Sequence, residues 1–282
     1  MSEATRIYGV LGWPLEHTLS PAMQQAAFQA RGLDATYLRF AVPPDALADA
    51  VRGVRALGIA GANVTVPHKQ LVIPLLDVVE PEARAIGAVN TIVRDAGVLI
   101  GCNTDAAGLV RALEEAKVAI ARADVVVIGA GGAARAAAFG AARAGARQVT
   151  ISARREEQAA ALVRDLSPVR KRASLVAIGV GVELREAFES ASIVIQTTPA
   201  TTGPARTAAA FVRSLPLDSL SDSATIVDLA YAPGESALLR EARRRGIRTV
   251  DGSAMLLHQG ALAFERWTGL AAPLSAMRAA LS

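Results

Sequence analysis

The stretch that decides the fold is DVVVIGAGGAAR, residues 124–135. Four β-branched residues run into a glycine-rich turn, and the small residues after the turn favour a helix. A strand that passes through G-x-G-x-x-A into a helix is typical of a dinucleotide-binding βαβ unit. Gly129 would permit the tight turn, Gly131 would let the backbone approach a pyrophosphate, and Ala134 would let the helix pack closely on the strand. Because alanine-rich and glycine-rich chains produce such matches by chance, a purely structural glycine turn is the alternative.

The residues after the next strand, Gln148–Ser152, bear on the choice between NAD and NADP. An acidic residue at this strand end binds the ribose hydroxyls of NAD, whereas arginine accommodates the extra phosphate of NADP. The strand end is uncharged and two arginines follow it, which favours NADP. Glu156, if turned toward the ribose, would favour NAD, so NAD remains the alternative cofactor. We expect the cofactor to contact Gly129, Ala130, Gly131, Gly132, Ala133, Ala134, Ser152, Ala153, Arg154 and Arg155.

Strand-like and helix-like segments alternate on both sides of this unit, with no internal repeat. Downstream, apolar runs predict further strands at residues 175–178, 193–196, 225–228 and 248–251. Upstream, strands are expected at residues 6–11, 35–42 and 59–66, with a hairpin at 89–94 and 98–102.

These patterns predict an α/β protein with two domains. A Rossmann-type doubly wound dinucleotide-binding domain should occupy residues 105–251. Residues 1–104 should form a separate α/β domain with mostly parallel strands. A C-terminal region, residues 252–282, contains a long alanine-rich helix that should return to this first domain and complete it.

The composition excludes several classes of protein. No stretch approaches the roughly 18 uncharged apolar residues of a membrane span, and the N-terminus lacks the basic and apolar regions of a secretion signal. The single cysteine, Cys102, fits a reducing cytoplasm. Three scattered histidines offer no metal-ligand spacing, and arginines without interleaved aromatic residues argue against nucleic acid. We therefore expect a cytoplasmic protein that binds small molecules, without a metal, nucleic-acid or membrane partner. The oligomeric state stays open, with a homodimer as one option.

Three segments of the first domain are dense in polar groups: residues 12–21, residues 63–69, and residues 101–105 with 87–91 before them. Each has an ordinary explanation when taken alone. Ser20 could be a helix N-cap with Pro21 at the first helical position. Lys69 and Asp105 could form a surface ion pair. A lysine can also exchange a proton with a substrate hydroxyl, and a neighbouring aspartate would orient it while favouring its protonated form.

Together these segments resemble the shikimate dehydrogenase family. The family's signatures match residues 12–21, 63–69, 87–91, 103–105, 129–135 and 259–264, in the family's order and over nearly the whole chain. The resemblance implies an NADP-dependent oxidoreductase that reduces 3-dehydroshikimate to shikimate, a step toward chorismate and the aromatic amino acids. It places the active site in a cleft between the two domains.

The resemblance also implies roles for individual residues. Lys69 and Asp105 match the catalytic pair, with Lys69 donating the proton during reduction. Thr197 and Met255 would join the cofactor site, Met255 beside the nicotinamide. Thr18 and Ser20 match the residues that hold the substrate carboxylate. The other positions that match substrate-binding residues are Asn63, Thr65, Asn90, Tyr231 and Gln259.

Several departures from the family pattern keep alternatives open. Thr18 replaces a serine, Gln196 replaces an asparagine, and His68 stands where phenylalanine is more usual, so we expect His68 to pack or to be partly exposed. These changes leave room for an NAD-using quinate/shikimate dehydrogenase or a relative acting on an amino analogue. An alternative of another class is a dinucleotide-binding sensor without catalysis, against which the Lys69/Asp105 pair argues.

Overall fold

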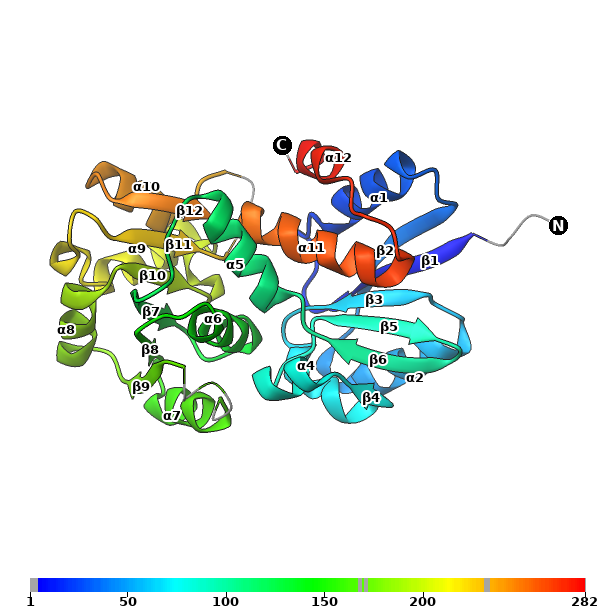
Figure 1. Cartoon of the computed structure of the whole chain (residues 1–282), viewed down its shortest axis with the longest axis horizontal. Helices are drawn as coiled ribbons and strands as arrows, with labels where there is room; N and C mark the ends of the chain where they lie inside the picture. The colour runs from blue at the N-terminus through cyan, green and yellow to red at the C-terminus, as the bar shows by residue number, and fades with distance from the viewer. Residues whose placement is uncertain (1–4, 167–168, 170–171, 231–233, 282) are drawn as a thin grey trace. The chain divides into compact units, whose positions relative to one another are not determined.

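The computed structural model describes residues 5–166, 169, 172–230 and 234–281 (Figure 1). The chain divides into two compact units, unit 1 (Met1–Gly108 with Leu256–Ser282) and unit 2 (Leu109–Met255). We expected boundaries before residue 105 and after residue 251. The units instead divide inside two helices, α5 (Asp105–Glu115) and α11 (Gly252–Thr268). Because each helix runs through its boundary without a break, no loop or change of composition marks the division in the sequence.

Unit 1 contains a mixed sheet with the strand order β2-β1-β3-β5-β6-β4. Strand β1 pairs in parallel with β2 and β3, and β4 pairs in parallel with β6, whereas β5 is antiparallel to both β3 and β6. The strands are β1 (Arg6–Gly12), β2 (Ala35–Ala41), β3 (Gly61–Val64), β4 (Val78–Val79), β5 (Thr91–Asp95) and β6 (Val98–Cys102).

The sheet order of unit 1 collects several chain segments at one edge. The carboxyl ends of β1, β3 and β6 and the amino end of β5 all lie there, because β1 and β3 are parallel to each other and β5 is antiparallel to β3 and β6. The hairpin turn between β5 and β6 consists of Ala96 and Gly97, with φ of 46° and 87°. A two-residue turn with both φ values positive matches the twist of an antiparallel pair. The hairpin therefore brings residues 90 and 103 close together at the shared edge.

Helices cover both faces of this sheet. Helix α2 packs with Val51 and Val54 into a core that includes Leu11 and Val64. On the other face, α1 and α11 contribute Phe28 and Phe264, whose ring centroids are 5.7 Å apart. The helices that begin in unit 1 are α1 (Ser20–Ala30), α2 (Leu47–Ala56), α3 (His68–Leu71), α4 (Pro81–Ile86), α5 (Asp105–Glu115) and α12 (Leu274–Ala279).

Unit 2 is a six-stranded sheet in the order β12-β11-β10-β7-β8-β9, and every pairing in it is parallel. This is the doubly wound order, with the reversal between β7 and β10. The strands are β7 (Asp124–Ile128), β8 (Gln148–Ser152), β9 (Ser174–Ile178), β10 (Ile193–Gln196), β11 (Thr225–Asp228) and β12 (Arg248–Asp251). The helices are α6 (Gly132–Arg143), α7 (Glu156–Asp165), α8 (Val182–Ser190), α9 (Ala205–Ser214) and α10 (Ala237–Arg244). The predicted Rossmann-type fold class is confirmed.

Short 3₁₀ turns lie at Pro44–Ala46, Ile73–Leu75, Pro199–Thr201 and Leu217–Ser219. Strand β4 and helix α4 were not expected from the sequence, because two- and six-residue elements are too short to show a period. Within the residues that the structure describes, no helix has the length and apolar character that a bilayer crossing needs.

Candidate active site

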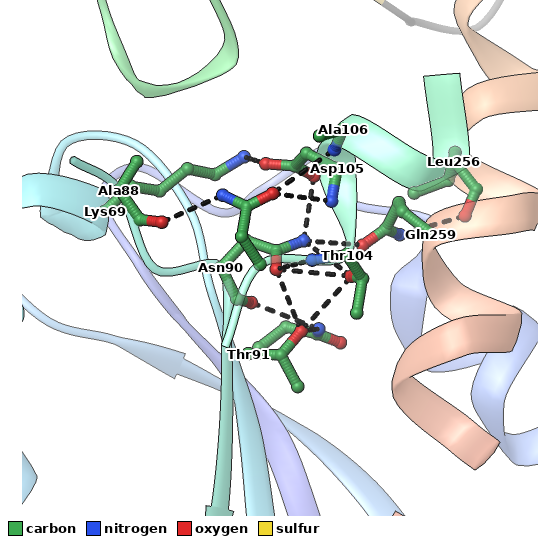
Figure 2. Close-up of polar contacts among 11 residues, drawn as sticks. Lys69, Ala88, Asn90, Thr91, Thr104, Asp105, Ala106, Leu256 and Gln259 are labelled. Carbon is green, nitrogen blue, oxygen red and sulfur yellow. Dashed lines mark hydrogen bonds and ion pairs between the residues drawn. The ribbon is translucent and has the colours of Figure 1, made fainter. Parts of the chain in front are cut away.

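Lys69 and Asp105 meet at the shared edge of the unit 1 sheet (Figure 2). Lys69 Nζ lies 2.6 Å from Asp105 Oδ2, and the side chains are 14% and 5% exposed. Lys69 sits on α3, which follows β3, and Asp105 is the first residue of α5, which follows β6. This pair is therefore largely removed from water, unlike the surface ion pair that the sequence left as an alternative.

Asn103, which sequence reasoning missed, sets the start of α5. Its Oδ1 accepts hydrogen bonds from the backbone N–H of Asp105 (3.0 Å) and Ala106 (3.2 Å), and its Nδ2 donates to Ala88 O (2.9 Å). The side chain thus satisfies N–H groups of the first helical turn and ties them to the segment before β5. The helix N-terminus also favours the negative charge of Asp105. An asparagine two residues before a helix was the signal that could have revealed this role.

Asn90 connects the Lys69–Asp105 pair to its surroundings. Its Nδ2 lies 2.8 Å from Asp105 Oδ1 and 2.8 Å from Thr104 Oγ1, and its Oδ1 accepts from Thr104 N at 2.7 Å. Asp105 is therefore held through both oxygens, by Lys69 on one and by Asn90 on the other. Because Asn90 is only 2% exposed, this arrangement fixes the carboxylate from the protein side.

Gln259 reaches the same group from α11. Its Oε1 accepts from Asn90 Nδ2 at 3.2 Å, and its Nε2 donates to Leu256 O at 2.9 Å (Figure 2). The Nε2 group has a second hydrogen, which neither of these bonds uses. Gln259 can thus donate to a ligand without releasing Asn90.

Asn63 and Thr65 come from β3 and its end. Asn63 Nδ2 donates to Asn90 O (3.2 Å) and to Thr91 Oγ1 (3.1 Å), so Asn63 joins the network around Asn90. We expected Thr65 to lie within a strand on the same face as Asn63. Strand β3 ends at Val64, and Thr65 lies just beyond it, although its N–H still donates to Leu11 O at 2.9 Å. The sheet pairing continues there in the backbone while the chain turns toward α3.

Thr18 and Ser20 lie in the segment that follows β1. Both are buried, and Ser20 N–H donates to Thr18 Oγ1 at 3.3 Å. Ser20 is the first residue of α1, and the N-cap residue, Leu19, forms no side-chain capping hydrogen bond. The alternative of Ser20 as an N-cap is therefore wrong. The Ser20 hydroxyl forms no hydrogen bond within the described residues, which leaves it available to a ligand.

The glycine-rich turn of unit 2 has the shape that a phosphate needs. Gly129 has a φ of 118°, and a Cβ there would overlap Thr197 Oγ1, which itself donates to Ile128 O at 2.7 Å. A Cβ at Gly131 would meet no atom within 4 Å, so the turn is open on that side. Helix α6 begins at the next residue, and Ala134 is fully buried against the sheet. The open backbone at a helix N-terminus fits a bound pyrophosphate.

Two exposed arginine side chains follow the end of β8. Arg154 and Arg155 are exposed, and neither side chain forms a hydrogen bond or ion pair with another described residue. The buried hydroxyl of Ser152, which we expected to contact the cofactor, donates to Gly179 O at 2.7 Å, and its oxygen can still accept a hydrogen bond. Glu156 Oε2 lies 3.5 Å from where a Cβ of Gly179 would be, so this carboxylate points to the turn after β9.

The remaining expected positions are either buried or outside the described residues. Met255 is buried in the first turn of α11, and Ala153 is buried after β8. Tyr231 lies outside the described residues. His68 is fully buried, with Nε2 2.7 Å from Val42 O, and is thus a packing residue rather than a partly exposed one. The structure shows no group of three metal-ligating side chains among the residues it describes.

Known proteins match the chain over nearly all of its length. The family model described as "Shikimate dehydrogenase substrate binding domain" matches residues 10–92. "Shikimate / quinate 5-dehydrogenase" matches residues 111–235, and "Shikimate 5'-dehydrogenase C-terminal domain" matches residues 252–281. A protein named shikimate dehydrogenase (NADP(+)) from Desulforamulus reducens is 46% identical over 97% of this chain and 94% of its own. The chain belongs to the shikimate dehydrogenase family.

Solved structures of the shikimate dehydrogenase family have the same fold. A crystal structure of a shikimate dehydrogenase in complex with NADP+ covers 100% of this chain and 96% of its own, with a TM-score of 0.87 and 36% identity. The Thermus thermophilus enzyme, in complex with NADP(H) and shikimate, covers 98% of both chains, with a TM-score of 0.83 and 34% identity. The region matched by the family's substrate-binding domain model contains Thr18, Ser20, Asn63, Thr65, Lys69 and Asn90.

Proposed function

We propose that the protein is an NADP-dependent shikimate dehydrogenase, which reversibly reduces 3-dehydroshikimate to shikimate on the route to chorismate and the aromatic amino acids. The observation that carries the proposal is the 2.6 Å contact between Lys69 Nζ and Asp105 Oδ2, held within the buried amide network of Asn90 and Gln259. The names of the relatives, and the NADP and shikimate in solved members of the family, support it.

Lys69 supplies the proton that the ketone oxygen of the substrate receives in this mechanism. An ammonium has three N–H donors, and one of them is used by Asp105, so another can bond to the ketone oxygen of the substrate. NADPH, when bound, supplies the hydride. As negative charge develops on the ketone oxygen, Lys69 Nζ releases a proton to it and forms the alcohol. The neutral amine then recovers a proton from solvent, and shikimate oxidation follows the reverse path.

Asp105 and Asn90 orient Lys69 rather than react. The Asp105 carboxylate stabilises the ammonium and limits the directions that it can take. Asn90 holds the opposite carboxylate oxygen at 2.8 Å, so Asp105 cannot follow Lys69 if the lysine swings away. The proton donor is in this way fixed before the substrate arrives, which is the condition for a productive geometry.

We assign substrate binding to the first domain, residues 1–104 with 252–282. Ring hydroxyls would bond to Asn63, Thr65, Asn90 and Gln259, and the carboxylate would accept hydrogen bonds from the hydroxyls of Thr18 and Ser20. Arg39 Nη2 donates to Thr18 O at 3.0 Å and places a positive charge beside this turn. That charge supports the assignment, because the group to be held is an anion.

We assign NADP binding to the second domain, residues 105–251. The phosphates would lie on the turn from Gly129 to Ala134, and the 2′-phosphate would pair with Arg154 and Arg155, whose side chains have no partner among the described residues. The direction of Glu156 toward the turn after β9 supports NADP over NAD. The alternative, an NAD-using quinate/shikimate dehydrogenase, requires this carboxylate to turn back to the ribose.

We infer a cytoplasmic enzyme that acts on small molecules, without a nucleic-acid partner. Cys102, the single cysteine of the sequence, is free and buried, which fits a reducing compartment.

The test is a rate assay on the purified chain that follows the absorbance of reduced nicotinamide. Each combination of shikimate or quinate with NADP or NAD is measured, and the highest kcat/KM is expected for shikimate with NADP. Lys69→Ala should lower kcat by about 10²- to 10⁴-fold, the usual contribution of a positioned acid or base, with a smaller change in KM. Lys117→Ala, at an exposed lysine of unit 2, is the control and should keep full activity. A wild-type chain without turnover, or a Lys69→Ala variant that changed KM alone, would contradict the proposal.

A further inference from the structure

Tyr37 contacts the candidate site from β2, a strand that carries none of the expected site residues. It lies in the middle of β2, is 4% exposed, and its hydroxyl is 2.7 Å from Asn63 Oδ1. No polar motif surrounds it in the sequence, where it reads as one aromatic residue of an alternating strand. In the fold, the aromatic ring packs near Trp267, with 6.1 Å between centroids, while the hydroxyl faces the amide.

The surroundings of Asn63 decide which way its amide is turned. Asn90 O, 3.2 Å from Asn63 Nδ2, is a carbonyl oxygen that can only accept a hydrogen bond. The atom that faces it must therefore be the NH₂ group. The second hydrogen of this group points to Thr91 Oγ1 at 3.1 Å. The oxygen of Asn63 is then left for Tyr37, whose O–H must be the donor.

We propose that Tyr37 is a positioning residue of the substrate site, and that its hydroxyl helps to hold Asn63 as a hydrogen-bond acceptor toward the substrate. Both Nδ2 hydrogens are used inside the protein, and Oδ1 has one lone pair left after it accepts from Tyr37. The site then selects at this position for a ring hydroxyl that donates. This inference rests on the proposed function and adds a specificity element to it.

The position of Tyr37 explains how such a bond resists the pull of a ligand. Tyr37 is anchored by its strand and by its ring contact with Trp267, whose Nε1 donates to Ile92 O at 3.0 Å. A tyrosine held in this way has few alternative rotamers, so its hydroxyl stays directed at Asn63. Loss of the hydroxyl leaves only Asn90 O and Thr91 Oγ1 to restrain the Asn63 amide, so its oxygen would be held less firmly toward the substrate.

The chain contains a matched control for this test. Tyr8 lies on β1, directly opposite Tyr37 in the parallel pairing, and is also buried against Trp267. Its hydroxyl interacts with Arg6 instead of a group of the active site. Tyr8→Phe and Tyr37→Phe therefore remove the same atom from neighbouring positions of one aromatic cluster.

The kinetic experiment compares wild type, Tyr37→Phe and Tyr8→Phe with shikimate and with analogues that lack one ring hydroxyl. Loss of a buried hydrogen bond should raise KM for shikimate about five- to tenfold in Tyr37→Phe, with kcat and KM for NADP within about twofold of wild type. The increase should disappear with the analogue that lacks the hydroxyl bound by Asn63. An equal increase in Tyr8→Phe, or the same increase with every analogue, would overturn the inference.

A second readout does not depend on the substrate. In ¹⁵N-labelled protein, exchange of the Asn63 side-chain amide hydrogens should be slow in wild type and Tyr8→Phe, and about tenfold faster in Tyr37→Phe, as expected when a buried group loses a restraint. Unchanged exchange would show that Tyr37 does not hold the amide. Lack of shikimate turnover in wild type would instead refute the proposed function and leave this measurement to decide the role of Tyr37.

Discussion

Replacement of Gly108 by alanine tests whether helix packing positions Gln259. Gly108 lies in the first turns of α5, where its N–H donates to Thr104 O at 2.9 Å. A Cβ at this position would lie 2.7 Å from both N and Cβ of Gln259, and 2.9 Å from its Cα. These are mostly backbone atoms of α11, so rotation of a side chain cannot relieve the overlap. One of the two helices must move.

The size of the effect follows from these distances. Carbon atoms in contact are about 3.5–4.0 Å apart, so the helices must separate locally by roughly 1 Å. Such overpacking costs about 1–3 kcal/mol, and the higher helix propensity of alanine offsets up to about 1 kcal/mol of it. A protein with a typical unfolding free energy of about 5–15 kcal/mol remains folded. A displacement of this size near the reacting groups can lower turnover by about 100-fold, so we expect kcat/KM for shikimate to fall by about 10- to 100-fold.

Gly53→Ala is the control, because Gly53 is also helical and a Cβ there would meet no atom within 4 Å. The same chemical change should stabilise the protein by about 0.4–1 kcal/mol at this position and leave activity intact. Both variants are compared by urea unfolding and by the rate assay. If Gly108→Ala retained full kcat/KM, or Gly53→Ala lost as much, the close approach of α5 to Gln259 would not be what positions that side chain.

Three further predictions concern the cofactor site and the cysteine. Arg154→Ser should raise KM for NADP about tenfold or more, the value of a charge-assisted bond to phosphate, and leave KM for NAD within about twofold of wild type. Arg206→Ser, at another exposed arginine of unit 2, is the control. An unchanged KM for NADP in Arg154→Ser would contradict the assignment. Burial raises the pKa of the Cys102 thiol from 9.0 to about 12, so the thiol stays protonated at neutral pH. Iodoacetamide should therefore label Cys102 only after unfolding, as measured by mass spectrometry, and rapid labelling of the native protein would contradict this. Because the folded state holds this proton more tightly, the contribution of Cys102 to stability should be complete below pH 9.0 and be lost as the pH rises toward about 12.

The sequence predicted the second domain closely, because its signals are local. Buried parallel strands appear as uninterrupted apolar runs, and the strands at residues 124–128, 148–152, 193–196, 225–228 and 248–251 have the expected bounds. The G-x-G-x-x-A motif needs only the strand and helix on either side of it. The order of the strands in the sheet followed from the fold class and not from any single segment.

The first domain was less predictable, since its key contacts join distant segments. Tyr37 meets Asn63 across 26 residues, and Gln259 meets Asn90 across 169. No periodic pattern records such a meeting, and Tyr37 looks like any strand aromatic until the sheet order is known. The partners of hydroxyl groups are hard to predict for a related reason. Ser20 and Ser152 both lie where a hydroxyl often serves a local role. Only the fold shows that the Ser20 hydroxyl has no hydrogen bond to another described residue and that the Ser152 hydroxyl donates to Gly179 O.

The division of unit 1 into two separate stretches of chain has a consequence for protein synthesis. During translation, the 147 residues of unit 2 (Leu109–Met255) emerge between the two stretches, which takes roughly 7 to 30 s at bacterial and eukaryotic elongation rates. Throughout that interval the nascent unit 1 lacks Phe264 and Trp267, so the aromatic side chains on its β1 and α1 remain uncovered. Unit 2, which is continuous in the chain, should therefore finish folding on the ribosome before unit 1, although the first stretch of unit 1 is made earlier.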